Sequence, residues 1–310
     1  MELNLTASDD YVSIYEALAS PVRLKIIRLL SEKAMNNTEL AEQLSLSKAI
    51  VTMHVNKLSD AGIITTELKR VGKTTTKIST LALNRITIDL PVLHDTNNDP
   101  FYEMRVPVGH YTDFLVRPTC GLATTEKIIG HLDDPRYFLD PARMNAGIVW
   151  LGTGFLEYKV PNYLLASDRP KTLEITMEIA SEAPSINEDW PSDISFYMNS
   201  LFIGTWTSPG DFGESRGIYT PRWWPRDINQ HGLRKIIRID DKGTFIDGEK
   251  LSTITINQLD LRQKYLTFRL SVPEDANHPG GLTLYGQGFG NYNEDLVFRL
   301  YYSSSQFQKA

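Results

Sequence analysis

The 310-residue sequence contains a single cysteine, Cys120, and no apolar run long enough to cross a membrane. One cysteine excludes an internal disulfide framework and is typical of proteins from a reducing compartment. Because a membrane-spanning helix needs about 20 mostly apolar residues, we expect no membrane partner. The segment Met1–Asp10 is polar and acidic and lacks the basic and apolar parts of a signal peptide. We therefore expect a cytoplasmic protein.

Motifs that mark common catalytic sites are also missing. Neither G-x-S-x-G nor H-E-x-x-H occurs. The glycine-rich stretch Gly286–Tyr292 is followed by no helical pattern, which indicates a β-turn rather than a phosphate-binding loop. The carboxylate pairs Asp240-Asp241 and Glu294-Asp295 lie in turn-like contexts, where acidic residues cap and solvate. We predict that the chain is not an enzyme, has no catalytic residue and needs no cofactor.

Side chains that ligate metals are few and poorly spaced. A soft metal prefers several thiolates, which one cysteine cannot supply within a chain. A group of possible ligands lies within 25 residues, but its spacing matches no known ligand pattern. This group consists of His110, Asp113, Cys120, His131, Asp133 and Asp134. We expect these residues to serve the surface and the core, and we predict no metal site.

Basic residues are concentrated in one segment of a chain whose net charge is −6. From Ser45 to Arg85 there are seven Lys and Arg residues against two acidic ones, a local net charge of +5. The rest of the chain therefore carries a net charge of −11. A basic segment on an acidic protein is typical of contact with phosphates, although charge alone is equally compatible with a solvated basic face.

The first part of the chain has the pattern of four short helices. Tyr11–Ala19 has helical spacing, and Ser20-Pro21 is a helix start with proline in the first turn. Thr38 is expected to cap a third helix, and Ser47–Asp60 is expected to form a fourth that Ser47 caps. The apolar positions expected to face inward are Val22, Ile26, Ile27, Leu30, Leu40, Ala41, Leu44, Val51, Val55 and Leu58.

The helical part ends in a predicted hairpin. Gly62 is expected to stop the fourth helix, and two β-prone runs then flank Val71-Gly72-Lys73. Helices followed by a two-stranded hairpin make a winged helix-turn-helix domain, which we assign to residues 1–85. Residues 86–100 end in a polar, turn-rich stretch and are the expected linker.

From residue 101 to residue 310 the pattern changes to short β-type segments separated by Gly, Pro, Asn and Asp clusters. The expected strands are Leu173–Ile179, Ile194–Met198, Leu201–Trp206, Lys235–Ile239, Ser252–Ile256, Tyr265–Val272, Leu282–Tyr285 and Leu296–Tyr302. Many short strands predict an antiparallel, jelly-roll-like β-sandwich. The fold class we expect is therefore a multidomain α+β protein, a winged helix followed by a β-sandwich.

The fourth helix is the expected DNA-reading element, since the major groove admits one α-helix. Lys48 lies in its first turn, where base edges are read, and Thr52 and Asn56 can hydrogen-bond bases or phosphates. The hairpin is expected to contact the neighbouring backbone or minor groove. The predicted DNA-contacting residues are Lys48, Ala49, Thr52, Met53, His54, Asn56, Lys57, Arg70, Lys73 and Lys77.

The stretches "ALASPVRLKIIRLL" and "TELAEQLSLSKAIVTMHVNKLSDAGII" resemble ArsR-type winged-helix regulators. The resemblance covers roughly residues 11–83 and implies a homodimeric transcriptional regulator of bacteria or archaea that binds an inverted-repeat operator in double-stranded DNA. Lys48-Ala49-Ile50 departs from the family pattern, so the family's base contacts do not transfer there. The third helix has no cysteine, so we expect no metal sensing at the family's usual sites.

The stretch Asp193–Gly213 is similar to a hairpin of galactose-binding-like β-sandwiches, which include many carbohydrate-binding modules. Ser200 stands where that hairpin has a glycine. Sugar rings stack on aromatic faces while polar groups bind their hydroxyls, although buried aromatic residues can equally serve a core or an interface. The candidate sugar-binding residues are Trp190, Trp206, Asp211, Glu214, Arg216, Trp223, Trp224, Asn291 and Tyr292.

Together these patterns predict a transcriptional repressor whose β-sandwich senses a small carbohydrate-like effector. Two alternatives stay open. The β-sandwich is an oligomerisation module without a ligand, or it is a sugar-processing enzyme joined to a winged helix.

Overall fold

The computed structural model describes residues 2–4, 11–71, 74–83, 86–89 and 99–304. The chain divides into two compact units, Met1–His94 and Asp95–Ala310. Residues 90–98 of the expected linker lie outside the described residues, and residues 87–89 form a short strand, β5 (Thr87–Asp89), that pairs in parallel with β1 (Glu2–Asn4). Within the described residues, no helix has both the length and the apolar character needed to span a membrane.

The N-terminal unit contains four helices, as the sequence predicted. They are α1 (Val12–Leu18), α2 (Pro21–Glu32), α3 (Asn37–Leu44) and α4 (Lys48–Asp60). Ser47 caps α4 as expected, because its side chain accepts a hydrogen bond from the Ile50 amide. The cap of α3 is Asn36 and not Thr38. The side-chain carbonyl of Asn36 accepts hydrogen bonds from the backbone amides of Thr38 and Glu39. The Glu39 carboxylate in turn accepts from the backbone amide of Asn36, which completes a capping box.

A three-stranded sheet completes the winged helix. It has the order β2-β4-β3, where β2 is Met35–Asn36, β3 is Ile64–Val71 and β4 is Thr74–Leu81. The hairpin of β3 and β4 is the wing, and the predicted contact Lys73 at its turn lies outside the described residues. The side chains predicted to face inward on α4, Val51, Val55 and Leu58, are fully buried in the core of this unit. The winged helix-turn-helix is therefore confirmed.

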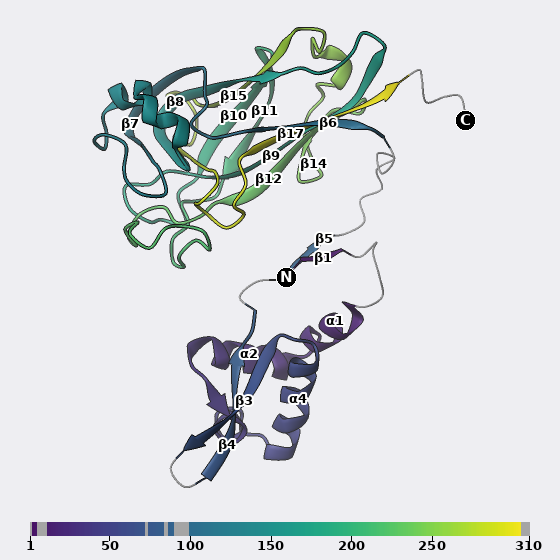
Figure 1. Ribbon diagram of the computed structural model, residues 1–310, viewed down its shortest axis with the longest axis vertical. Helices are drawn as coiled ribbons and strands as arrows, with labels where there is room; N and C mark the ends of the chain where they lie inside the picture. The colour runs from purple at the N-terminus through teal and green to yellow at the C-terminus, as the bar shows by residue number, and fades with distance from the viewer. Residues whose placement is uncertain (1, 5–10, 72–73, 84–85, 90–98, 305–310) are drawn as a thin grey trace. The chain divides into compact units, whose positions relative to one another are not determined.

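The second unit is antiparallel, which confirms the predicted β-sandwich class (Figure 1). Its strands are β6 (Phe101–Val106), β7 (Asp113–Ala123), β8 (Ile148–Pro161), β9 (Asp168–Ala180), β10 (Ser192–Met198), β11 (Leu201–Ser208), β12 (Leu233–Ile239), β13 (Thr244–Ile246), β14 (Glu249–Ser252), β15 (Tyr265–Val272), β16 (Leu282–Tyr285) and β17 (Leu296–Ser304). Short 3-10 helices η3 (Pro135–Leu139) and η4 (Pro141–Asn145) lie between β7 and β8.

Seven of the predicted strands lie within observed ones, and one was wrong. The predicted strand Ser252–Ile256 is mostly not a strand, because β14 ends at Ser252 and a 3-10 helix, η5 (Ile256–Gln258), follows. Thr255 and Gln258 form a capping box there, which favours a helical turn over a strand. The sequence analysis also missed β6, β7, β8 and β13, and it included only the last residue of β14.

Two long strands join the layers of the sandwich. The first half of β8 pairs with β16 and its second half with β15, while β9 pairs first with β17 and then with β16. Within β8, Gly154 has a φ of +117°, a conformation that residues with a side chain rarely adopt. A Cβ at this position would also lie 1.8 Å from the Leu115 carbonyl oxygen. The inward faces of these strands build one large apolar core.

A smaller core lies on the outward face of the same sheet. Its centre is Trp224, which stacks edge-to-face on Trp150 of β8 and on Phe289, with ring centroids 5.8 and 5.2 Å apart. Trp224 belongs to the connection between β11 and β12, which we call the covering loop (residues 209–232). Phe289 belongs to the connection between β16 and β17, which we call the closing loop (residues 286–295).

Glu178 of β9 holds both loops in place. Its carboxylate is 2% exposed and accepts hydrogen bonds from the amides of Gly232, Asn291 and Tyr292 at 2.8–3.0 Å. Gly290 allows this approach, since a Cβ there would lie 2.4 Å from the carboxylate oxygens. The end of the covering loop and the middle of the closing loop therefore meet at one buried carboxylate.

We predict that Glu178→Gln lowers the free energy of unfolding by about 2–4 kcal/mol, because the amide turns an N–H group toward three N–H donors. Urea denaturation of the full chain measures this loss. The matched control is Glu249→Gln, at an exposed position of β14. Equal midpoints for the two variants would show that Glu178 does not hold the loops.

Candidate functional site

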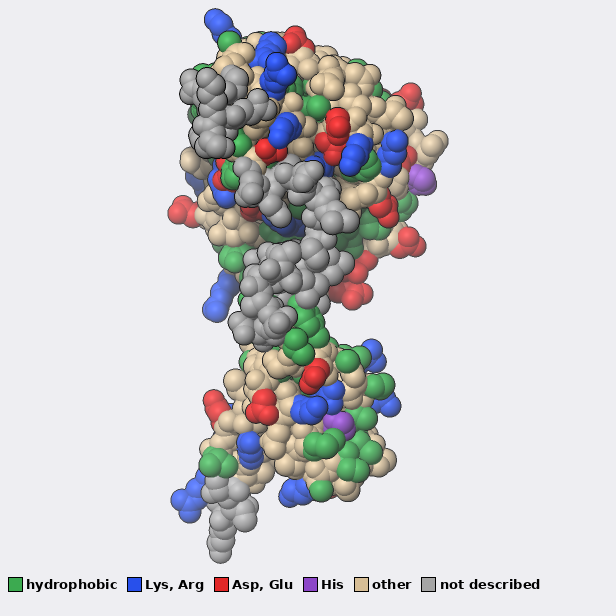
Figure 2. Space-filling view, turned by 90° about the vertical axis from the view of Figure 1, so that its right-hand side faces the viewer, with side chains coloured by type: hydrophobic (Ala, Val, Ile, Leu, Met, Phe, Trp, Pro, Cys, Tyr) green, Lys and Arg blue, Asp and Glu red, His purple; other side chains and the backbone are tan. Residues whose placement is uncertain are grey.

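The outward side of α4 is the candidate DNA-reading surface. The turn between α3 and α4 passes through Ser45, which is left-handed with a φ of 53°, and presents the start of α4 to solvent. The predicted contacts Lys48, Ala49, Met53, Asn56 and Lys57 are all exposed. Figure 2 shows Lys and Arg side chains on this unit with hydrophobic side chains exposed between them. Ile50 of α4 is 43% exposed, an apolar side chain on this surface that the sequence analysis did not include.

Thr52 is the predicted contact whose hydroxyl is already engaged. It accepts a hydrogen bond from the Asn37 side-chain amide at 2.9 Å and donates to the Lys48 carbonyl at 2.8 Å. The hydroxyl proton is therefore used within the protein, which differs from the predicted base or phosphate contact. Its effect in this structure is to tie α4 to the start of α3.

His54 lies on the outer side of α4 and is partly exposed. Its Nδ1 is 3.3 Å from the Arg23 guanidinium, which extends from the first turn of α2. Arg23 is 8% exposed and was not among the predicted site residues, although it belongs to the stretch that carried the ArsR resemblance. Burial lowers the pKa of His54, and the positive charges of Arg23 and Lys57 lower it further.

The wing adds exposed cations near its turn. Arg70 of β3 and Lys77 of β4 are exposed, as is Lys69, which pairs with Glu67 at 3.8 Å. Leu68 is also exposed. The wing thus offers at least two unshielded positive side chains for a phosphate backbone.

In the second unit, neighbouring tryptophans of the covering loop have opposite surroundings. Trp224 is 1% exposed and donates its Nε1–H to the Asn229 carbonyl, so it belongs to the core instead of offering a face to a sugar as expected. Trp223 is 40% exposed, and its Nε1–H donates to the Thr125 carbonyl at 2.6 Å. The ring of Trp223 is therefore both accessible and held in one orientation.

The polar candidates beside Trp223 are largely engaged in holding the loops. The Arg216 guanidinium donates to the carbonyls of Pro221 and Trp224. The side-chain carbonyl of Asn291 accepts from the Ile218 backbone amide at 3.0 Å, and the backbone amide of Asn291 donates to Glu178. Tyr292 lies next to it and also donates its amide to Glu178. These contacts bring Arg216, Asn291 and Tyr292 into the same pair of loops as Trp223.

The remaining candidates lie elsewhere in the unit. Trp206 of β11 carries the Lys235 ammonium over its ring at 4.7 Å. Trp190 and Glu214 lie where residues 187–190 run beside the first part of the covering loop, since the Trp190 amide donates to the Pro209 carbonyl and the Glu214 amide donates to Glu188. The structure therefore does not gather all the predicted aromatic residues into one site. It adds two exposed residues that the prediction missed, Ile218 and Tyr219 of the covering loop.

Two carboxyls act on each other here, since Glu182 lies partly buried just after β9 and Asp211 lies buried within the covering loop. Glu182 accepts hydrogen bonds from Asn229 and Thr283 at 2.8 and 2.7 Å, and the next amide along the chain, that of Ala183, donates to Asp211. Burial, then the charge of Asp211, raises the pKa of Glu182 to about 8. Burial likewise raises the pKa of Asp211 to about 7. Asp211, which the sequence analysis predicted to contact a sugar, is 1% exposed and therefore lies in the interior.

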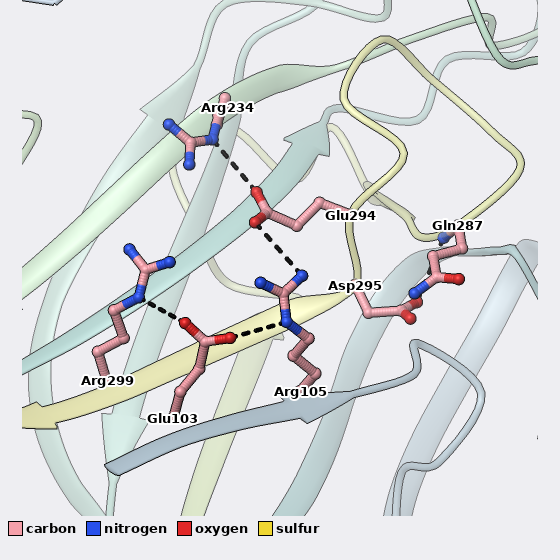
Figure 3. Close-up of polar contacts among 7 residues, drawn as sticks. All are labelled: Glu103, Arg105, Arg234, Gln287, Glu294, Asp295 and Arg299. Atoms are coloured by element: carbon pink, nitrogen blue, oxygen red, sulfur yellow. Dashed lines mark hydrogen bonds and ion pairs between the residues drawn. The ribbon is translucent and has the colours of Figure 1, made fainter. Parts of the chain in front are cut away.

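The carboxylate pair Glu294-Asp295 is split by the fold (Figure 3). Glu294 faces the outer surface between Arg105 and Arg234, at 3.9 and 3.3 Å. Asp295 points away from Glu294 and accepts from the backbone amide of Gln287 at 3.2 Å. Burial raises the pKa of the Asp295 carboxyl.

Glu103 continues the surface network, since it bridges Arg105 and Arg299 at 2.8 Å each. The result is a row of charges across β12, β17 and β6, in which each of the two carboxylates lies between two arginines. Such pairing stabilises a surface and leaves no free general acid or base in this row.

The possible metal ligands noted in the sequence are also spread out. In the described part of the chain, no group of three or more His, Cys, Asp and Glu side chains is arranged to hold a metal ion. His110 is bonded to the Met144 carbonyl, and Asp133 accepts from the Cys120 amide. Burial raises the pKa of the Cys120 thiol to about 12.

Comparison with known proteins places the first unit in a family. Residues 20–66 match the family model described as "Bacterial regulatory protein, arsR family". The uncharacterized HTH-type transcriptional regulator MJ0229 of Methanocaldococcus jannaschii is 38% identical over 69 residues, which are 22% of this chain and 73% of that protein.

Two solved structures are similar to parts of the chain. HlyU from Vibrio cholerae N16961 is 26% identical, with coverage of 24% of this chain and 75% of HlyU and a TM-score of 0.21. The CBM36-1 domain of a multidomain xylanase from the hindgut metagenome of Trinervitermes trinervoides is 12% identical, with coverage of 64% and 96% and a TM-score of 0.29. Both TM-scores are low, so neither similarity bears on a ligand or an activity of this chain.

We predict that the stability of the second unit falls as pH rises from about 4.5 to about 8, because Glu182 ionises first in the unfolded chain and stays protonated in the folded one. Folding then takes up a proton, and the loss approaches a few kcal/mol, on the order of 1.4 kcal/mol per pKa unit. Asp211 adds to the effect in the same direction, up to about pH 7.

Glu182→Gln should flatten this dependence and raise the melting temperature above that of the wild type in mildly alkaline buffer. Thermal unfolding of the full chain across a pH series measures it. Glu126→Gln, at an exposed position, is the control. A Glu182→Gln variant with the wild-type pH profile would contradict the prediction.

Proposed function

We propose that this chain, which belongs to the arsR family of bacterial regulatory proteins, is a DNA-binding repressor whose second unit responds to a small carbohydrate-like effector. The observation that supports DNA binding is the outward side of α4, which is free of the unit's core and carries exposed Lys48 and Lys57. The exposed cations of the wing, Arg70 and Lys77, extend the same positive surface.

Each part of this surface has a separate role in the proposal. Lys48, Ala49, Ile50 and Met53 enter the major groove, where apolar side chains contact thymine methyl groups and Lys48 reads base edges. Lys57 and the wing bind phosphates, which fixes the position of α4 without reading sequence. Two copies of the chain related by a two-fold axis bind an inverted repeat.

The effector surface is proposed at Trp223. Its indole is accessible, and the hydrogen bond to Thr125 holds its orientation before any ligand arrives. A flat aromatic face held in place suits the apolar face of a sugar ring at little entropic cost. Tyr219 and Tyr292 of the two loops lie in the same loop cluster and add further ring and hydroxyl surface.

The effector acts only if it binds the DNA-competent and DNA-incompetent states with different affinity. The alternative of an oligomerisation module rests on another observation. Leu115, Leu132, Leu139 and Met144 are exposed apolar side chains on β7, η3, η4 and the segment between them. Burial of these side chains against a second copy needs no ligand.

We predict that Lys57→Gln and Lys77→Gln each weaken binding to a random-sequence DNA duplex and reduce the slope of log affinity against log salt by about 0.9, as the loss of one phosphate contact requires. Fluorescence anisotropy over a salt series measures both quantities. Lys127→Gln, exposed in the second unit, is the control with the wild-type slope. Unchanged slopes in both variants would remove α4 and the wing from the phosphate contact.

We further predict that at least one mono- or disaccharide raises the melting temperature of the full chain, and that Trp223→Ala abolishes this shift. Loss of one stacking face costs about 1–1.5 kcal/mol of binding, roughly a five- to tenfold loss of affinity. Phe202→Ala, an exposed aromatic residue on β11, should keep the shift. No shift with any sugar, together with a monomeric Leu139→Asp variant of an otherwise dimeric chain, would favour the oligomerisation alternative.

A further inference from the structure

Arg23 is a buried cation that has no carboxylate partner among the described residues. Its Nε–H donates to the Ala17 carbonyl at 2.7 Å, and its Nη2 donates to the Glu16 carbonyl at 2.6 Å. Both carbonyls belong to the end of α1, where the helix dipole is negative. The guanidinium is thus fixed by the backbone of α1, and its remaining Nη1 faces the Nδ1 of His54 on α4.

This contact determines the chemical form of His54. A guanidinium carries only donors, so the Nδ1 that faces it at 3.3 Å must accept. An imidazole whose Nδ1 accepts is neutral and carries its proton on Nε2. The charged groups that act on the ring are Arg23 from α2 and Lys57 from α4, and both oppose a further positive charge on it.

We propose that His54 donates its Nε2–H to a phosphate oxygen of DNA as an uncharged group, and that Arg23 positions the ring for this contact. The inference rests on the proposed DNA binding. His54 lies one turn before Lys57 on the same helix, so the two side chains can follow one strand of the backbone. The structure assigns them different roles, since Lys57 neutralises a phosphate and His54 only orients one.

If His54 binds DNA as a neutral donor, it contributes to the affinity for DNA but not to the salt dependence of that affinity. A neutral donor strengthens binding through one hydrogen bond to a charged acceptor but releases no counterion. Its loss therefore lowers affinity and leaves the salt slope unchanged, whereas loss of a cation lowers both. Binding through an uncharged His54 is also insensitive to pH across the range in which a free histidine titrates.

The test measures binding of the full chain to a random-sequence duplex by anisotropy, over a salt series and from mildly acidic to mildly alkaline pH. His54→Phe, which keeps the ring shape without a donor, should lose about tenfold in affinity with the wild-type slope. His54→Gln, whose side-chain amide restores a neutral donor near the Nε2 position, should recover most of that affinity. Lys57→Gln is the matched control whose slope falls.

Three results would overturn the inference while wild-type DNA binding stands. They are a His54→Phe affinity equal to the wild type, a salt slope that falls in His54→Phe as it does in Lys57→Gln, and a wild-type affinity that rises as His54 becomes protonated on acidification. A wild-type chain that binds no duplex even at low salt would overturn the proposed function itself.

A second readout reports on the ring without DNA. Nitrogen chemical shifts of imidazole-labelled full chain, with the His54 signal identified by its absence from His54→Gln, distinguish the two neutral tautomers and the cation. The expected result is the Nε2–H tautomer in the wild type and a mixture of forms in Arg23→Met. A cationic or Nδ1–H ring in the folded wild type would overturn the assignment.

Discussion

The buried carboxylate of Glu178 is the interaction on which the outward face of the second unit depends. An ion removed from water needs close hydrogen bonds to replace its hydration, and three backbone amides supply them here. Those amides come from two separate loops, Gly232 from the end of the covering loop and Asn291-Tyr292 from the closing loop. The arrangement explains how a covering loop without regular secondary structure can present Trp223 in a single orientation.

Arg23 applies the same principle with the opposite sign in the first unit. Its guanidinium is satisfied by backbone carbonyls at the end of α1, and it passes that constraint to α4 through His54. The Asn37–Thr52 bond adds a second tie between α4 and the start of α3. Buried charge satisfied by the backbone is more rigid than an exposed ion pair, which water and salt weaken. The helix α4, which we propose reads DNA, is therefore held at two points of its length.

The two units also differ in how they use charge. On the described part of the first unit, the cations of α4 and the wing are exposed while Arg23 is buried, and exposed cations suit a phosphate backbone. On the second, the arginines of β6, β12 and β17 alternate with Glu103 and Glu294, and the surface is close to neutral locally. The carboxyl groups of Glu182 and Asp211 lie in partly and fully buried positions, respectively, and burial favours their protonated forms. The proposed affinity for DNA therefore depends on the exposed cations of the winged helix and not on the net charge of the chain.

The sequence by itself determined the features that depend on local periodicity. Val51, Val55 and Leu58 recur at helical spacing and are buried on α4, and seven strands of the sandwich follow from the alternation of their apolar residues. β8 escaped detection because Gly152 and Gly154 interrupt its pattern. Only the tertiary structure decided which side chains are free to act. Trp223 and Trp224 are adjacent in sequence and differ in exposure, because Phe289 and Trp150 cover only the second.

The same limit applies to Thr52, His54 and Glu178. Their partners lie 15, 31 and 113 residues away, and contacts over such separations leave no periodic trace in the chain. The sequence gives the type of each residue, but the protonation, the hydrogen-bond partners and the exposure of its side chain depend on the residues that the fold packs beside it.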